Sequence, residues 1–102
     1  MRTLILLRHG RAVPHDAAPD FERPLTEKGR RDSVTAGILL KEAEIVPDVA
    51  LVSPAQRTRM TWNEAQRGLP PIHGTLLPAL YQANSDEILE IIQEMEIGRA
   101  HV

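Results

Sequence analysis

Cysteine is absent from this sequence of 102 residues, which excludes disulfides and thiolate metal sites. Aromatic residues are scarce at 3%, so we expect no stacking surface for single-stranded nucleic acid. A large excess of one charge sign is also lacking, because the formal net charge is only -2. With no overall attraction for nucleic acid, any anion site must be a local cluster of basic residues.

Long hydrophobic runs are missing as well. The apolar run of residues 4–7 is stopped by Arg8 and His9, far short of a secretory core or a membrane span. We therefore expect no membrane partner, and the absence of cysteine fits a cytoplasmic protein. A length of 102 residues with 42% hydrophobic residues suits one small domain.

The first half of the chain contains the signals of one strand and one helix. Residues 3–7 form a continuous apolar run, which predicts a strand buried on both faces. Residues 8–24 are polar and rich in proline, so we expect a loop. Thr26 is a good N-cap, and it predicts a helix that runs to about Glu44.

The second half repeats the alternation. Residues 49–52 predict another strand, and residues 53–56 then combine a serine cap, a proline at the first helical position and a capping-box glutamine. This helix should end near residues 68–71. A short strand is expected within residues 72–78, and a last helix from Ser85. The pattern predicts an α/β fold with a parallel-type sheet flanked by helices.

Two loops directly follow predicted strands, where ligands bind in open α/β sheets. This position places Arg8, His9 and Arg57 in one candidate crevice. Arginine offers planar, permanently charged donors for phosphate oxygens, and histidine offers a nitrogen nucleophile near physiological pH. Gly10 allows a tight turn and lets the backbone approach a ligand.

Four motifs in order make the chain resemble a known family. Arg8-His9-Gly10 after a strand resembles the signature of the histidine phosphatase superfamily, which includes the phosphoglycerate mutases. Residues 53–61 are similar to its second motif, a serine-proline turn followed by an arginine and a threonine. Residues 23–29 and 80–83 resemble the small phosphohistidine phosphatases of the SixA type. The resemblance runs from about residue 3 to residue 92.

The resemblance implies a role for each matched residue. His9 would attack phosphorus and become phosphohistidine, with its other nitrogen held by a hydrogen bond, which we expect to go to a backbone carbonyl. Arg8 and Arg57 would hold the phosphate oxygens, so neither a metal nor a cofactor is needed. Arg23 either extends the phosphate pocket or pairs with Asp20 or Glu22. The remaining substrate-binding candidates are Gly10 and Ser53; the latter is also expected to cap its helix.

Two parts of the family pattern are not matched. The resemblance implies a second catalytic histidine after a later strand, and none of His15, His73 and His101 corresponds to it. The proton donor stays unassigned among several acidic residues, namely Asp16, Asp20, Glu22, Asp86 and Glu87.

The last seven residues read like the translation of a common sequencing adapter followed by an in-frame stop. We therefore expect residues 1–95 to be the N-terminal part of a single histidine phosphatase domain, and residues 96–102 to be a non-native tail. The last helix should break at this tail, and the sheet should be incomplete at the C-terminus. Such a chain should fold poorly, aggregate and be inactive.

The leading hypothesis for the complete protein is a phosphohistidine phosphatase whose partner is a phosphorylated histidine-containing protein. The alternatives are a small-molecule phosphomonoesterase of the same superfamily and a non-catalytic phosphate-binding module. Larger members of the family carry long helical insertions over the site, whereas here only residues 41–48 separate the first helix from the second strand. An open site suits a bulky protein substrate.

Overall fold

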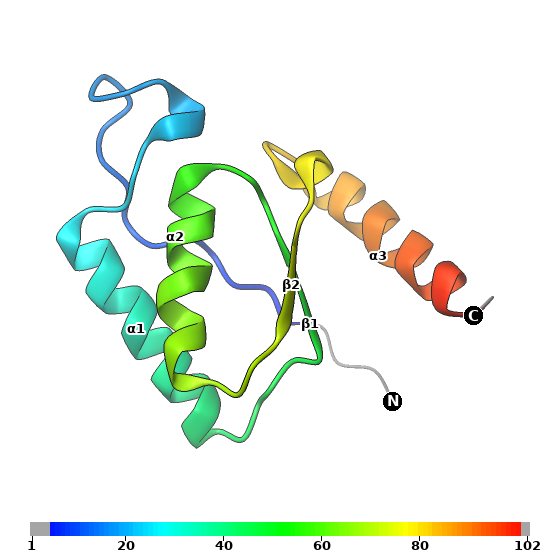
Figure 1. The fold of residues 1–102 in the computed structure, drawn as a ribbon. Coiled ribbons are helices and arrows are strands. Elements are labelled where there is room, and N and C mark those ends of the chain that lie inside the picture. Colours follow the sequence, from blue (N-terminus) through cyan, green and yellow to red (C-terminus); the bar gives the residue numbers. More distant parts are fainter. Residues whose placement is uncertain (1–4, 101–102) are drawn as a thin grey trace.

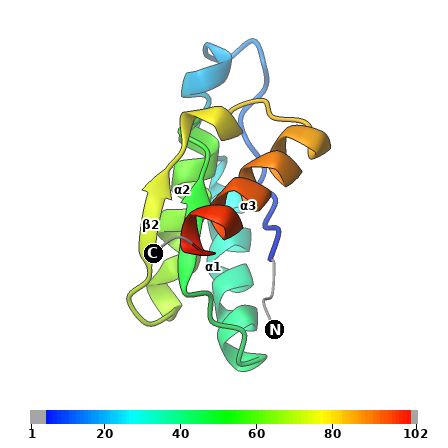
Figure 2. The same ribbon diagram turned by 90° about the vertical axis from the view of Figure 1, so that its right-hand side faces the viewer.

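A computed structural model describes residues 5–100 as an α/β fold. The helices are α1 (Glu27–Glu42), α2 (Gln56–Ala65) and α3 (Ser85–Ala100). The strands β1 (Val49–Val52) and β2 (His73–Leu76) pair in parallel, and α2 connects them. Helices α1 and α2 lie on one side of the strands and α3 lies on the other, as Figures 1 and 2 show. The predicted fold class is confirmed.

The two helices on the first side approach each other very closely. Gly37 of α1 lies against the backbone of Ala65 at the end of α2, and a Cβ atom at Gly37 would overlap the carbonyl of Ala65. Both residues are buried. The contact fixes how α2, which carries Arg57, sits against α1.

The start of α1 confirms the predicted cap. The Thr26 hydroxyl accepts a hydrogen bond from the Gly29 backbone N–H at 3.0 Å and satisfies one of the free donors of the first turn. The helix ends at Glu42, near the predicted end, and Glu44 follows with φ of 58°, in the left-handed region.

The predicted cap of α2 at Ser53 is wrong. Helix α2 begins at Gln56, its N-cap is Ala55, and no side chain caps it. Ala55 is extended with ψ of 140° because its side chain turns into the core, where only 1% of the residue is exposed. Burial of Ala55 thus outweighs the local preference for a helix that starts at Pro54, and Ser53 Oγ instead accepts from Ala55 N at 3.4 Å.

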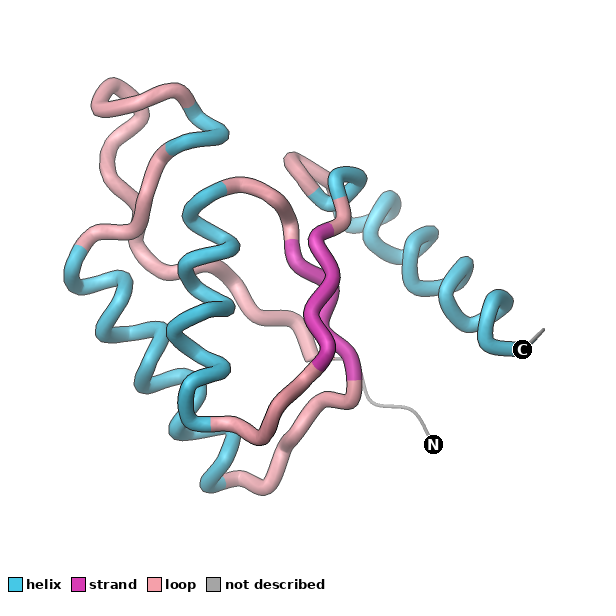
Figure 3. The backbone as a smooth tube through the Cα atoms, in the orientation of Figure 1, coloured by secondary structure: helices cyan, strands magenta, loops and turns pink. Residues whose placement is uncertain are grey.

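The predicted first strand is not formed in its described part. Residues 3 and 4 lie outside the described residues, and residues 5–7 run as a loop (Figure 3). Leu6 and Leu7 are exposed, and within the described range the sheet has two strands. An apolar run makes a strand only when a neighbouring backbone supplies its hydrogen bonds, and none does so here.

Helix α3 starts at Ser85 as predicted but does not break where expected. Asn84 caps it reciprocally: Asn84 Oδ1 accepts from Glu87 N at 2.9 Å, and Glu87 Oε1 accepts from Asn84 N at 3.3 Å. The helix then continues to Ala100. One glycine at position 98 costs about 1 kcal/mol in a helix, which is too little to end it among good helix formers. That residues 96–102 are non-native stays a prediction.

The core of the described residues is small. Its buried hydrophobic residues are Leu25, Val52, Ala55 and Ala65, and none of the large side chains described is fully buried. Large apolar side chains such as Leu76 and Leu89 are more than half exposed. Among the described helices, none is long and apolar enough to cross a membrane.

Candidate active site

The loop that carries the first motif lines a cavity of about 290 Å³. Arg8, His9 and Gly10 form one wall, while Ser33 of α1 and Thr61 of α2 form the other. Arg8 is exposed and His9 half-buried. The structure therefore brings together two of the three predicted catalytic residues in one concave site.

His9 is held by a hydrogen bond to its own neighbour. Its Nδ1 lies 2.8 Å from the carbonyl oxygen of Gly10. A carbonyl oxygen only accepts, so Nδ1 must carry the proton, and Nε2 of the neutral ring then has a free lone pair. The predicted backbone carbonyl partner is confirmed, and this contact favours the tautomer that a nucleophile needs.

Gly10 links the His9 loop to both helices. Its N–H donates to the Thr61 hydroxyl at 3.0 Å, and this hydroxyl donates to the carbonyl of Arg57 at 2.8 Å. A Cβ at Gly10 would lie 2.6 Å from the carbonyl oxygen of Gly29, inside any real contact. Glycine is required here because the backbone of the loop approaches α1 closely, whereas the expected close approach was to a ligand.

Arg57 does not line this cavity, although its backbone carbonyl accepts from Thr61, one of the lining residues. Its Nη1 donates to the backbone carbonyl of Asp20 at 2.7 Å, and its Nη2 donates to Asp20 Oδ2 at 3.3 Å. The side chain is 11% exposed. Its Nε is buried, and no acceptor among the described residues reaches it.

Arg23 pairs with Asp20, one of the two alternatives that the sequence left open. Its Nε and Nη2 donate to Asp20 Oδ1 at 3.2 and 3.0 Å, and its Nη1 donates to the carbonyl of Val13 at 2.9 Å. The side chain is only 10% exposed. Arg23 therefore contributes a buried positive charge beside Arg57.

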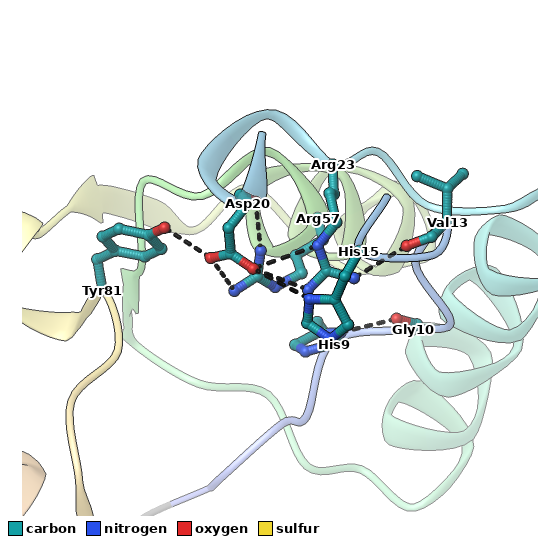
Figure 4. A network of polar contacts seen from close by, with 8 residues as sticks. All are labelled: His9, Gly10, Val13, His15, Asp20, Arg23, Arg57 and Tyr81. Carbon is teal, nitrogen blue, oxygen red and sulfur yellow. Dashed lines mark hydrogen bonds and ion pairs between the residues drawn. The ribbon is translucent and has the colours of Figure 1, made fainter. Parts of the chain in front are cut away.

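Tyr81 makes a polar contact that the sequence did not indicate. Its hydroxyl donates to Asp20 Oδ2 at 2.6 Å, and its ring meets Phe21 edge to face at 5.0 Å. Figure 4 shows Asp20 between Tyr81 and the two arginines, in the same close-up as His9. Since 61 residues separate Tyr81 from Asp20, no local pattern could have indicated the contact.

These contacts also lower the pKa of Asp20. The hydrogen bond from Tyr81 is the largest cause that lowers its pKa, burial opposes it, and Arg23 and Arg57 add to the lowering. The pKa of Asp20 falls to about 2 from its ordinary 3.8. The lowered pKa disfavours Asp20 as the proton donor that the sequence left unassigned.

Other candidates lie away from these contacts. Ser53 is half-buried at the end of β1 and bonds to its own turn. His15 is exposed, with Nδ1 3.9 Å from Asp20 Oδ1, and His73 is exposed at the start of β2. His101 lies outside the described residues. Among the described residues, no group of three or more histidine or acidic side chains could hold a metal ion.

Similar structures are SixA proteins. A protein assigned as the phosphohistidine phosphatase SixA from Agrobacterium tumefaciens is 33% identical, with a TM-score of 0.79 over 86% of this chain and 58% of that one. The protein histidine phosphatase SixA complexed with tungstate is 32% identical, with a TM-score of 0.73 over 87% of this chain and 58% of that one.

Similar curated sequences carry another name. The 2,3-bisphosphoglycerate-dependent phosphoglycerate mutase of Bartonella bacilliformis is 41% identical over 63 residues, which are 59% of this chain and 31% of the mutase. That of Bartonella quintana is 32% identical over 94% of this chain and 53% of its own length. The chain thus spans about half the length of the relatives that it matches most fully.

The family itself is clear from the extent of the match. The model of the histidine phosphatase superfamily (branch 1) matches residues 4–98, nearly the whole chain. This range contains the His9 loop, the Arg57 helix and the Tyr81 turn described above. The chain belongs to the histidine phosphatase superfamily.

Proposed function

We propose that the complete protein is a phosphohistidine phosphatase that works through a phosphohistidine on His9. The observation that carries the proposal is the 2.8 Å contact between His9 Nδ1 and the Gly10 carbonyl, which leaves Nε2 free to attack. In the first step Nε2 forms a bond to phosphorus while the bond from phosphorus to the substrate imidazole breaks. Water then attacks phosphorus, inorganic phosphate leaves, and His9 is restored.

The charges around His9 fit this chemistry. Phosphoryl transfer needs positioning and stabilisation of charge on the phosphate oxygens more than it needs other covalent chemistry. Arg8 lines the cavity with His9, and the backbone of Arg57 is linked through Thr61 to the loop that carries His9. The departing imidazole is a good leaving group once it is protonated by solvent. No dedicated acid is then required, in agreement with the ionised state of Asp20.

The form of the site supports a protein substrate. The connection between α1, which ends at Glu42, and β1, which begins at Val49, is short. Among the described residues no helix is inserted in this connection, which supports access by the histidine of a folded phosphoprotein. The similarity to SixA structures adds support, and the complete protein is expected to act in the cytoplasm.

The second candidate is activity on a small phosphate ester, favoured by the similarity to phosphoglycerate mutases. The experiment supplies the full-length gene product with a histidine-containing protein labelled on phosphohistidine, and in parallel with phosphoglycerates. Fast release of label from the protein alone supports the proposal. Faster turnover of phosphoglycerates contradicts it. Bound label without release in either case indicates a phosphate-binding module.

His9→Ala is the matched control of this assay. It removes the nucleophile but leaves the surrounding contacts of Gly10 and Thr61 in place. Release of phosphate should stop, and phosphate should no longer be trapped in an acid-labile, base-stable form on the enzyme.

A further inference from the structure

Asp20 joins three segments that lie far apart in the sequence. Its Oδ1 accepts from Arg23, its Oδ2 accepts from Arg57 and Tyr81, and its backbone carbonyl accepts from Arg57 again. Arg23, Arg57 and Tyr81 belong to three of the four motifs singled out in the sequence. The function proposed above uses Arg57 but gives no role to Tyr81 or Asp20.

The contacts hold Arg57 by one edge only. Nη1 and Nη2 are the end of the guanidinium group, and both donate to Asp20, at 2.7 and 3.3 Å. Two of the five N–H bonds of an arginine are thus used, and three remain, that of Nε among them. A donor that is buried without an acceptor is costly, and Nε of Arg57 is such a donor among the described residues.

The charges favour an anion at the remaining donors. Asp20 carries one negative charge, while Arg23 and Arg57 carry two positive ones, so the cluster keeps a net positive charge. The carboxylate is also fully occupied by Arg23 and Tyr81, which weakens its repulsion of a second anion. Asp20 can therefore fix the arginine without taking the place of a phosphate.

We propose that Asp20 is a positioning residue for the phosphate clamp: it fixes the end of Arg57, which is not itself part of the cavity lining, and leaves the other guanidinium N–H groups for a phosphoryl group transferred to His9. Tyr81 and Arg23 hold the Asp20 carboxylate in place for this task. The inference rests on the proposed function for its substrate, but the clamp itself would bind any tetrahedral oxyanion.

The test measures the affinity of the full-length protein for inorganic tungstate or phosphate by calorimetry, together with kcat and KM. Asp20→Ala should weaken oxyanion binding on the order of tenfold and lower kcat by ten- to a hundredfold. Asp20→Asn keeps an acceptor oxygen for Arg57 and should fall between the wild type and Asp20→Ala. The control is Asp16→Asn, an exposed carboxylate of the same loop, which should change neither quantity by more than about twofold.

Tyr81→Phe keeps the proposal testable if Asp20→Ala fails to fold. It removes only the hydroxyl that donates to Asp20, and we expect binding to weaken on the order of two- to fivefold. The effect must appear in the affinity and kcat of the folded fraction. Reduced stability with unchanged affinity and kcat would show a purely structural role and overturn the proposal.

The direction of the change in oxyanion affinity separates the remaining outcomes. Tighter oxyanion binding by Asp20→Ala would mean that Asp20 competes with phosphate for Arg57, which overturns the proposal. Weaker binding in a protein without phosphohistidine phosphatase activity would contradict the proposed function and still support the positioning role, because oxyanion binding does not depend on the substrate.

Discussion

Two regions of this molecule are held together by different forces. Around Asp20, buried charged groups are fixed by directional hydrogen bonds from Arg23, Arg57 and Tyr81. Away from this cluster, β2 and α3 expose large apolar side chains, with Leu76 at 51% and Leu89 at 53%. The first region depends on charge and geometry, whereas the second depends on apolar area that the described residues only partly cover.

The difference shows where single substitutions should act. In the Asp20 region, the loss of one donor leaves buried charges without partners, so effects should be large and local. In the region of β2 and α3, side chains contribute through buried area, and Leu76 and Leu89 bury only about half of theirs. Substitutions there should change association more than activity.

The largest effect is expected for His9→Ala, which removes the proposed nucleophile and leaves the packing of both regions unchanged. Turnover of the full-length protein should fall on the order of 10⁴-fold or more, because the nucleophile of a covalent mechanism has no substitute. Steady-state kinetics and the thermal unfolding midpoint together check the prediction. His15→Ala is the control, since His15 is exposed, with 86% of its side chain accessible. A comparable rate in His9→Ala would mean that another residue is the nucleophile.

Arg57→Lys should come next. Lysine keeps the charge, but its ammonium cannot bond Asp20 with one edge and a phosphate with another. We expect a loss of about 3 kcal/mol of transition-state stabilisation, on the order of a hundredfold in kcat/KM. Arg59→Lys is the control, because Arg59 is exposed beside a second cavity lined by Trp62. Equal losses of activity in both variants would show that Arg57 is not the arginine that specifically binds phosphate.

Gly10→Ala should be smaller but should affect stability and activity together. The new Cβ would lie 2.6 Å from the Gly29 carbonyl, so the His9 loop must move away from α1. Overpacking of this kind costs about 1–3 kcal/mol, measurable by urea unfolding. Gly68→Ala adds a Cβ that meets nothing within 4 Å and should change stability by less than about 0.5 kcal/mol. A stable Gly10→Ala protein with normal kinetics would contradict the described contact.

The pH dependence of stability is a separate measure of the Asp20 region. The hydrogen bond to Asp20 raises the pKa of Tyr81 above its ordinary 10.0. Its contribution to stability is present below pH 10 and is lost as the pH rises through the raised pKa. The pKa of Asp20 is about 2, lowered from 3.8, so its contribution is present above about pH 4 and is lost as the pH falls through 2.

Tyr81 is the only tyrosine, so the tyrosinate absorbance titrates this one group. Its midpoint should move toward the ordinary value in Asp20→Asn, which removes the charge that the phenolate would face. An unchanged midpoint would mean that Tyr81 and Asp20 are not in contact in solution.

The smallest effect on activity is expected in the second region. Replacing Leu76 and Leu89 with serine should reduce self-association and dye binding of the 102-residue chain, because both side chains present apolar surface to water. Light scattering and size-exclusion chromatography measure the change. Leu25→Ser is the contrasting control: Leu25 is 5% exposed, and its loss should cost about 2–5 kcal/mol. Unchanged association in the double variant would show that other surfaces are responsible.

Short-range signals in the sequence predicted the elements well. Thr26, residues 49–52 and Ser85 mark the start of α1, the whole of β1 and the start of α3, because caps and apolar runs act within a few residues. The cap at Ser53 failed because burial of Ala55, a property of the whole fold, decides where α2 begins. The strand at residues 5–7 failed because its hydrogen bonds would have to come from a distant segment.

The candidate site shows the same division between short-range and long-range contacts. A backbone carbonyl partner for the His9 ring was expected, and only the structure shows that it is the adjacent Gly10 carbonyl. The link from Asp20 to Arg57 spans 37 residues and that to Tyr81 spans 61, so only the folded chain reveals them. Motif resemblance indicated that these segments matter together, but it did not indicate that a carboxylate joins them.

The close approach of α1 and α2 has a genetic consequence. Any side chain at Gly37 would overlap the backbone carbonyl of Ala65, and not its side chain. A second substitution at position 65 therefore cannot make room, because every residue has the same carbonyl group. In a selection for revertants of Gly37→Ala, suppressors should arise where they let the two helices move apart as bodies. Revertants that restore glycine at position 37 should be more frequent than revertants with a compensating substitution at Ala65.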